Sequence, residues 1–151
     1  MENYKEQALR FLKSNHLAAV GTISKNGEPH VATLLYLMDD DFNFYFITHR
    51  YTRKCNNLEG NNKVGIAITS DANGPETVQI QGESEILANN SKEFVDRLNE
   101  WMDASTSYYG SFLKVTSAEF WIFKVKTNWL RYMTVKEGGE EYHQIIPGDR
   151  F

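Results

Sequence analysis

Hydroxyl and cationic side chains between residues 44 and 58 have the types and spacing needed to bind a phosphate group. Thr48, Thr52, Arg53 and Lys54 lie where the sequence predicts a strand, a short loop and the start of a helix. The first N–H groups of a helix have no partner within it and carry partial positive charge, so they attract anions. Arginine binds phosphate oxygens through a planar fork, and lysine adds a mobile charge. The pattern predicts a phosphate-monoester site, although basic pairs are also common on solvated helices.

Other residue types limit the chemistry that the chain can carry. Cys55 is the only cysteine, so no intrachain disulfide or cysteine-based metal cage can form, and we expect this thiol to be buried. The four histidines, at positions 16, 30, 49 and 143, have no acidic residue at a local spacing typical of a catalytic triad. We therefore predict no catalytic side chain and no metal site.

Composition indicates one globular domain over residues 1–151. The chain is 41% hydrophobic and 13% aromatic, and its formal charge is -4. This acidic balance argues against a nucleic-acid partner, which requires clustered cations. No apolar signal region or run of transmembrane length is present in the sequence, which predicts a cytoplasmic protein that does not bind membranes.

The first half of the chain is expected to form a helix and then strands. Asn3–Ser14 is amphipathic, and the strands His16–Ser24 and Val31–Met38 flank Asn26 and Gly27, a pair typical of a type I′ hairpin turn. Later elements follow from alternation and capping residues. The strand Phe42–Thr48 has Phe42, Phe44 and Phe46 on one face. A helix Thr52–Glu59, capped by Thr52, follows. The next strand is Lys63–Ser70, and its small face of Gly65, Ala67 and Thr69 leaves room for something wide to lie against it.

The second half continues the alternation. A long strand Glu76–Leu87 contains Gly82, which predicts a β-bulge. A helix begins near Asn90 or Ser91, with Glu93 expected to close a capping box, and its apolar stripe is Phe94, Val95, Leu98, Trp101 and Met102. The strands Ala118–Lys126 and Asn128–Val135 follow, and residues 136–151 read as a polar tail. Together these elements predict a mainly β protein, a six- to seven-stranded antiparallel barrel with peripheral helices.

Three stretches in order resemble the pyridoxamine 5′-phosphate oxidase family of FMN-binding split barrels, in its short, general-stress-protein-like form. They are the opening hairpin at 19–36, the strand and Thr-Arg-Lys run at 44–58, and the long strand at 78–87. A weaker likeness covers 123–132. The order and spacing of the stretches carry the resemblance, since no single one of them is diagnostic.

The resemblance implies FMN as cofactor and a homodimer with FMN at the subunit interface. It implies that Arg53 and Lys54 bind the FMN phosphate, assisted by Thr48 and Thr52. The flavin ring would lie beside the backbone of Val31, Ala32, Thr33 and Leu34, with Thr77 and Gln79 approaching from the long strand. Candidates for completing the site from the second subunit are Tyr108, Tyr109, Trp129 and Tyr132. His30 and His49 would lie near the flavin, where either could relay a proton.

The resemblance also has a clear departure. Longer family members carry a C-terminal Arg- and His-containing segment that grips the substrate, and residues 138–151 do not match it. Vitamin B6 oxidation is therefore not expected. The sequence predicts an FMN-dependent oxidoreductase acting on a small molecule or on electrons from a nicotinamide donor. Alternatives are a barrel that binds haem or the deazaflavin F420, a non-catalytic flavin-binding sensor, and an oligonucleotide-binding barrel, which the acidic charge disfavours.

Overall fold

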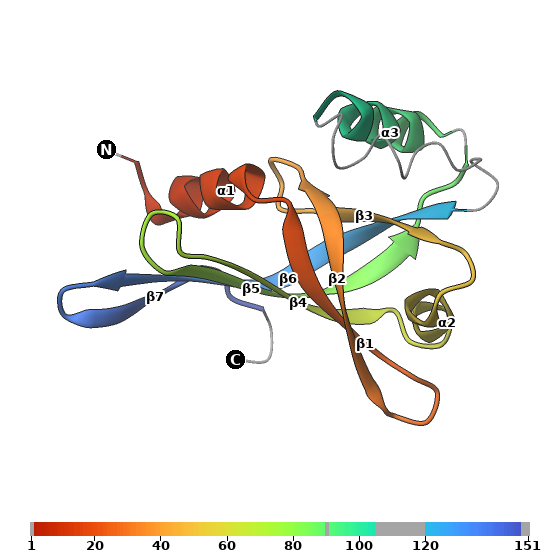
Figure 1. Cartoon of the computed structure of the whole chain (residues 1–151), viewed down its shortest axis with the longest axis horizontal. Helices are drawn as coiled ribbons and strands as arrows, with labels where there is room; N and C mark the ends of the chain where they lie inside the picture. Colours follow the sequence, from red (N-terminus) through yellow and green to blue (C-terminus); the bar gives the residue numbers. More distant parts are fainter. Residues whose placement is uncertain (1, 90, 105–119, 149–151) are drawn as a thin grey trace.

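The computed structural model describes residues 2–89, 91–104 and 120–148, and these form a six-stranded antiparallel barrel with one extra strand and three helices (Figure 1). The elements are α1 (Tyr4–Ser14), β1 (Leu17–Ile23), β2 (Pro29–Met38), β3 (Phe44–His49), α2 (Arg53–Gly60), β4 (Lys63–Ser70), β5 (Glu76–Ile86), α3 (Lys92–Ala104), β6 (Phe120–Lys136) and β7 (Gly139–Ile146). The predicted fold class is confirmed.

The strands follow the order β3-β2-β1-β4-β5-β6-β7, and a further pairing of β3 with β6 closes the barrel. Strand β7 lies outside the closed ring, and β6 is its one partner among the described strands. Closure pairs β3 with β6 and so covers most of the edge that a six-stranded sheet would otherwise expose. No helix in the described ranges is long and apolar enough to cross a membrane.

The barrel opens between β2 and β3. These strands pair only where Tyr36–Met38 meet Phe44–Phe46, whereas β3 pairs with β6 along its whole length, from Phe44 to His49. The part of β2 before Tyr36 therefore has β1 on one side and no strand of the described chain on the other. This opening exposes a backbone edge near the end of β3.

Side chains of β3 serve two apolar clusters on its opposite faces. Phe44 and Phe46 are fully buried in the barrel interior, with Phe42 beside them, as the alternation predicts. Tyr45 and Ile47 face the other way and pack with residues of α3 and the first residues of β6. Both faces of β3 are therefore covered by apolar side chains.

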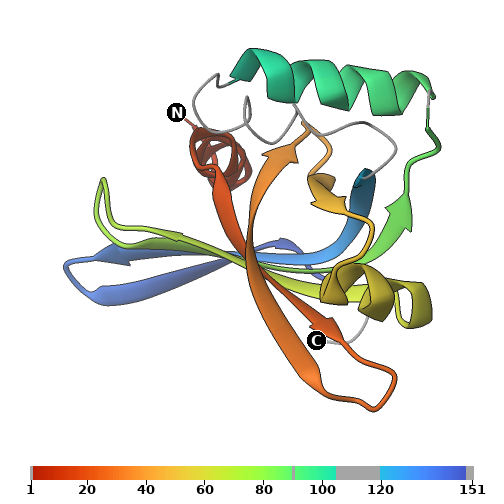
Figure 2. The same ribbon diagram turned by 45° about the vertical axis from the view of Figure 1, so that its right-hand side comes forward.

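Helices α1 and α2 lie at opposite ends of β1 (Figure 2). Asn3 closes a capping box with Glu6 at the start of α1, and the Tyr36 hydroxyl donates to the Leu12 carbonyl at 2.6 Å. At the other end, the Asn57 amide of α2 donates to the Thr22 hydroxyl of β1 at 3.0 Å, and both side chains are buried. This last contact fixes α2 relative to the sheet.

The prediction of a type I′ turn between β1 and β2 was wrong. Such a turn requires positive φ at both central residues, but here only Gly27 has it, with φ 79°. The Gly27 N–H donates to the Ser24 carbonyl, and the Ser24 N–H donates to the Glu28 carbonyl. The connection is a three-residue loop with glycine in the left-handed position, which Asn-Gly serves equally well.

The C-terminal part also differs from the prediction. The two expected strands form one strand, β6, and residues 139–146 of the expected tail form β7; residues 118 and 119 lie outside the described ranges. The register of β5 and β6 shifts between Gln81 and Gly82, so the bulge predicted at Gly82 is confirmed, with Asn128 as the unmatched residue on β6. The extra residue of the bulge changes the phase of the inward and outward alternation of side chains along β6, which is why the sequence pattern predicted two strands there.

Helix α3 begins after Ser91, one of the two residues predicted to cap it. Ser91 caps it by accepting from the Phe94 N–H at 3.1 Å, while Asn90 and the Met102 side chain lie outside the described part. The expected stripe is buried at Phe94 and Trp101 and partly at Leu98, but Val95 is exposed. With Ser91 as the cap, the third helical residue is Phe94, so Glu93 is not at the capping-box position after Ser91.

Glu93 instead clamps α3 to the barrel. Its carboxylate accepts from the Tyr45 hydroxyl and pairs with the Lys124 ammonium, each at 2.8 Å. The Lys124 contact lowers the pKa of Glu93 below its ordinary value of 4.5; burial opposes this, and the Tyr45 hydroxyl adds to the lowering. A carboxyl with a lowered pKa in the folded state stabilises that state above its ordinary pKa and loses the contribution as pH falls.

We expect Glu93→Gln to lower the free energy of unfolding by about 1 kcal/mol at neutral pH, because Glu93 is partly exposed and its ion pair is screened. The difference from the parent protein should vanish as pH falls below 4.5. Urea unfolding across this pH range measures both effects. Asp96→Asn is the control, since the one described partner of Asp96 is the exposed Lys92 on the same helix. Equal losses in the two variants, or a loss independent of pH, would contradict the clamp.

Candidate functional site

The structure brings Thr48, Thr52, Arg53 and Lys54 together where β3 ends and α2 begins. The hydroxyl oxygens of Thr48 and Thr52 lie 3.4 Å apart, and Thr48 is buried. Thr52 caps α2 as predicted, because its hydroxyl accepts from the Cys55 N–H at 3.4 Å. We call these four residues the cradle.

The cradle has unused donors. The Thr52 carbonyl accepts from the Asn56 N–H, which closes the first turn of α2. The backbone N–H groups of Arg53 and Lys54 have no acceptor among the described residues. Two adjacent N–H groups at a helix start, beside two cationic side chains, form an arrangement that binds anions.

The cations of the cradle lack a close counterion. Burial lowers the pKa of Lys54, and no described carboxylate pairs with it. The nearest carboxylate to Arg53 is Glu28, at 3.8 Å and exposed to solvent. A half-buried ammonium without a counterion costs free energy, which a bound anion would offset. The cradle therefore fits a phosphate group.

The opening between β2 and β3 supplies a second set of polar groups. The Tyr36 N–H donates to the His16 carbonyl, and the Ser24 N–H donates to the Glu28 carbonyl. Because hydrogen-bonded and non-hydrogen-bonded pairs alternate along an antiparallel ladder, the backbone groups of the even-numbered β2 residues bond to β1. The N–H and C=O groups of Val31 and Thr33 then point away from β1, toward the side from which β3 has departed. This edge could hydrogen-bond a flat heterocycle. Ala32 and Leu34 turn their side chains to the opposite face of the strand from Val31 and Thr33.

The remaining predicted residues lie elsewhere in the same protomer. Thr77, Gln79 and Trp129 are on the outer face of β5 and β6, where Thr77 contacts the Thr69 hydroxyl at 3.2 Å and Gln79 accepts from Arg131 at 2.9 Å. Trp129 is separated from Val31 by four strand spacings, about 19 Å along the sheet. The open edge of β2 faces away from these strands, so the structure does not bring the three residues to the cradle.

Two of the residues expected to meet a second subunit lie outside the described ranges, and a third is placed differently. Tyr108 and Tyr109 belong to the segment that is not described. Tyr132 is 2% exposed and points into the barrel, where its hydroxyl donates to Glu76 at 2.5 Å. The expectation that Tyr132 contacts a partner was therefore wrong, because position 132 faces inward in the register of β6.

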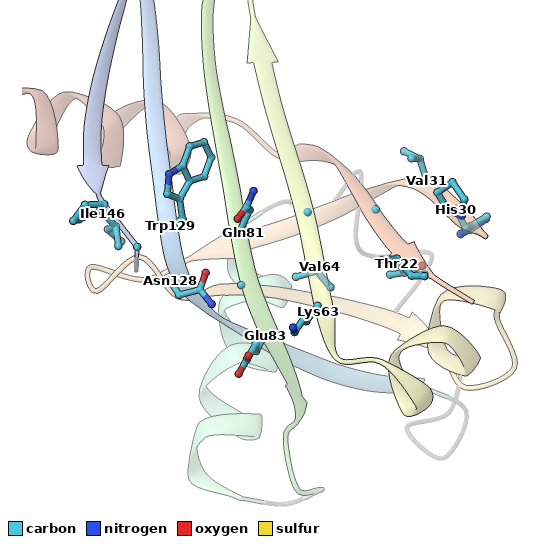
Figure 3. Close-up of a pocket in the computed structure, with 17 residues that line it drawn as sticks. Thr22, His30, Val31, Lys63, Val64, Gln81, Glu83, Asn128, Trp129 and Ile146 are labelled. Carbon is cyan, nitrogen blue, oxygen red and sulfur yellow. The ribbon is translucent and has the colours of Figure 1, made fainter. Parts of the chain in front are cut away.

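A pocket of about 760 Å³ lies on the outer face, at the end of the sheet near the β1–β2 hairpin (Figure 3). Val31 and Trp129 line it, together with Gly21, Gly65 and Gln81 of the strands between them. The cradle residues do not line it. The sequence analysis missed this pocket, although the small face predicted for β4 was a signal of it.

Cys55, His30 and His143 are all at least partly buried. Cys55 is fully buried, as expected, with its sulfur 3.1 Å from the His49 carbonyl. The Nδ1 atom of His30 is buried at the pocket without a partner in the described residues, and His143 stacks on Tyr4. Within the described ranges, no group of three or more His, Cys, Asp or Glu residues is placed to hold a metal ion.

Glu28 is a cradle neighbour that sequence analysis did not single out. Its carboxylate would repel a dianion held by Arg53, since the two side chains are 3.8 Å apart. We expect Glu28→Gln to tighten binding of a phosphate-bearing ligand about two- to fivefold, in line with a weak exposed ion pair. Isothermal titration with FMN and riboflavin is the measurement. Riboflavin, which lacks the phosphate, should bind both proteins equally, and weaker FMN binding in the variant would contradict this role.

Comparisons with known proteins agree with the fold. The family model described as pyridoxamine 5′-phosphate oxidase matches residues 4–134. A protein from Clostridium acetobutylicum related to general stress protein 26 superimposes with a TM-score of 0.69 at 21% identity, covering 94% of each chain. No curated protein matches the sequence.

Two other solved structures differ in what their descriptions say they bind. An FMN-binding protein from Nostoc punctiforme superimposes with a TM-score of 0.63 at 14% identity, covering 93% of this chain and 94% of its own. A haem-binding protein from Mycobacterium smegmatis superimposes with a TM-score of 0.71 at 15% identity, covering 95% of this chain and 59% of its own. At these identities the likeness concerns the fold, whereas the family model covers most of the sequence. The chain belongs to the pyridoxamine 5′-phosphate oxidase family.

Proposed function

We propose that this protein binds FMN and is an FMN-dependent oxidoreductase. The observation that carries the proposal is the cradle, where Arg53 and a half-buried Lys54 converge with two N–H groups of α2, and where the described residues supply neither a counterion for Lys54 nor an acceptor for the N–H groups. A phosphate monoester satisfies all of these groups at once. The open edge of β2, at the neighbouring end of the sheet, supports the same ligand because a flavin ring carries hydrogen-bonding groups along one side.

Each residue has a role in this proposal. Arg53 and Lys54 bind the phosphate, and the hydroxyls of Thr52 and Thr48 orient its oxygens. The backbone from Val31 to Leu34 holds the polar side of the ring. FMN, when bound, supplies the hydride chemistry, so the protein contributes position, shielding from water and hydrogen bonds to the ring.

We also propose a homodimer in which the second copy completes each site. Thr77, Gln79 and Trp129 lie on the outer face, away from the cradle of their own protomer, so they would contact the cofactor held by the other copy. This face also exposes apolar side chains, among them Leu17 at 55% and Val31 at 66%. Exposed apolar area of this kind favours association.

The substrate is a small molecule or a nicotinamide electron donor, and a cytoplasmic location remains a prediction. Vitamin B6 oxidation is not part of the proposal. Residues 139–146, part of the stretch that does not match the substrate-gripping segment of longer family members, pair with β6 as β7.

Purification of the full chain tests the proposal. The protein should be yellow, or should become so with added FMN, and denaturation should release FMN. Light scattering on a sizing column should give twice the mass of 17.4 kDa. A Soret band would assign the barrel to haem, a deazaflavin spectrum would assign it to F420, and a colourless protein that takes up no flavin would contradict the proposal.

A further inference from the structure

A buried hydrogen bond joins the middle of α2 to β1. The Asn57 amide donates to the Thr22 hydroxyl at 3.0 Å, and the two residues are 5% and 2% exposed. Asparagine is a poor residue for the interior of a helix, so local preference does not explain its presence in α2. A polar pair taken out of water is tolerated when its members bond each other. The contact therefore points to a role in tertiary structure.

Few side chains hold α2 against the barrel. Of its eight residues, Cys55, Asn57 and Leu58 are buried. The apolar contacts of Cys55 and Leu58 have no preferred direction, and so they allow the helix to tilt on the barrel. Near the helix start, the Cys55 sulfur donates to the His49 carbonyl at 3.1 Å. The bond from Asn57 adds a second directional contact further along α2, and two such contacts fix the direction of the helix axis.

The direction of this axis matters for the cradle. The first N–H groups of a helix point along its axis, away from the helix body. The N–H groups of Arg53 and Lys54 therefore point where the axis points. Asn57 lies about one turn after Arg53, so its bond to β1 acts close to these groups. A tilt of α2 would move them relative to Thr48, which is held in β3.

Thr22 connects the same bond to the open edge of β2. In the ladder between β1 and β2, Thr22 pairs with His30 and Gly21 pairs with Val31 (Figure 3). The edge that is proposed to hold the flavin ring begins at Val31, so Thr22 lies next to the strand pair where that edge begins. A short path through Asn57 and Thr22 therefore links the phosphate end of the proposed site to its ring end.

We infer that Asn57 and Thr22 are positioning residues, which set the spacing between the cradle and the open edge of β2. The inference rests on the proposed function, because this spacing matters for a ligand that binds at both ends. When one end of FMN is bound, binding of the other end is an intramolecular step whose strength depends on the spacing. Riboflavin has no phosphate, so its affinity should not depend on the bond.

Isothermal titration of the flavin-free full chain with FMN and riboflavin tests the inference. Thr22→Val replaces the hydroxyl by a methyl group of similar size, which leaves the buried Asn57 amide without its acceptor. This variant should bind FMN about tenfold more weakly than the parent protein and riboflavin within about twofold of it. Thr22→Ser keeps the hydroxyl and should bind both flavins like the parent protein.

Tyr36→Phe is the matched control. It removes another buried hydrogen bond, from the Tyr36 hydroxyl to the Leu12 carbonyl, at the opposite end of β1. This variant should also unfold at lower urea concentration than the parent protein, but it should bind FMN normally. Combining Thr22→Val with Asn57→Leu should weaken FMN binding no further than Thr22→Val alone, because both changes break the same bond.

Hydrogen exchange on the flavin-free protein separates two kinds of failure. Thr22→Val should speed exchange of the α2 amides, whereas Tyr36→Phe should leave it unchanged. Unchanged FMN affinity in Thr22→Val, equal losses of FMN and riboflavin, or an equal FMN loss in Tyr36→Phe would overturn the inference. A parent protein that takes up no FMN would contradict the proposed function. Faster α2 exchange in Thr22→Val would then still support the hold on the helix, and unchanged exchange would overturn it.

Discussion

Replacing Arg53 and Lys54 together by alanine is expected to weaken FMN binding by roughly 10²- to 10⁴-fold. Each hydrogen bond to a charged group is worth about 1.5–3 kcal/mol, and two of them give about 3–6 kcal/mol. Arg50, the other cation of the same loop, lies over the Trp121 ring and is not one of the cradle residues. Isothermal titration of the flavin-free protein measures the change directly.

The control removes equal charge elsewhere. Arg10 and Lys13 lie on α1 and pair with Glu2 and Asp40 in exposed ion pairs, so alanine at both should leave FMN affinity within about twofold. Riboflavin should bind the Arg53/Lys54 variant and the parent protein alike, because it has no phosphate. A variant that retains FMN, or one that loses riboflavin equally, would show that the phosphate is bound elsewhere.

Gly82→Ala is expected to lower the free energy of unfolding by about 2–4 kcal/mol. A Cβ at this position would lie 2.6 Å from the Lys126 carbonyl oxygen and 2.6 Å from Val125 Cγ1. The carbonyl belongs to a paired backbone, so the β5–β6 ladder must shift at its bulge to make room. Urea unfolding compares the variant with the parent protein.

Gly65→Ala is the control, since a Cβ there meets nothing within 4 Å. It is also in a strand, so both variants carry the same change in strand propensity. We expect Gly65→Ala to alter the free energy of unfolding by less than about 0.5 kcal/mol. Similar losses in the two variants would mean that the close approach at Gly82 does not limit stability.

Local signals in the sequence predicted local structure well. Asn3 and Thr52 cap their helices because a short polar side chain before an amphipathic stretch has few other partners. The alternation of Phe42, Phe44 and Phe46 placed all three in the barrel interior. Gly82 marked its bulge because only glycine fits so close to the neighbouring backbone. The grouping of the cradle also followed from local spacing.

Features that depend on distant pairing could not be read from the sequence. The departure of β3 from β2 is set by its pairing with β6, some 75 residues away. The inward direction of Tyr132 depends on the bulge at Asn128, which shifts the register of β6. The separation of Trp129 and Gln79 from the cradle appears only when the strand order is known. For the same reason the outer-face pocket was signalled in the sequence only by the small face of β4, which supplies Gly65 to its lining.

A crystal structure of the FMN complex tests the central claim most directly. The account predicts the phosphate within hydrogen-bond distance of the Arg53 and Lys54 side chains and the first N–H groups of α2, with the ring along the open edge of β2 and a second copy of the chain covering it. Phosphate density at any other place, or a ring enclosed by one copy alone, would contradict the account.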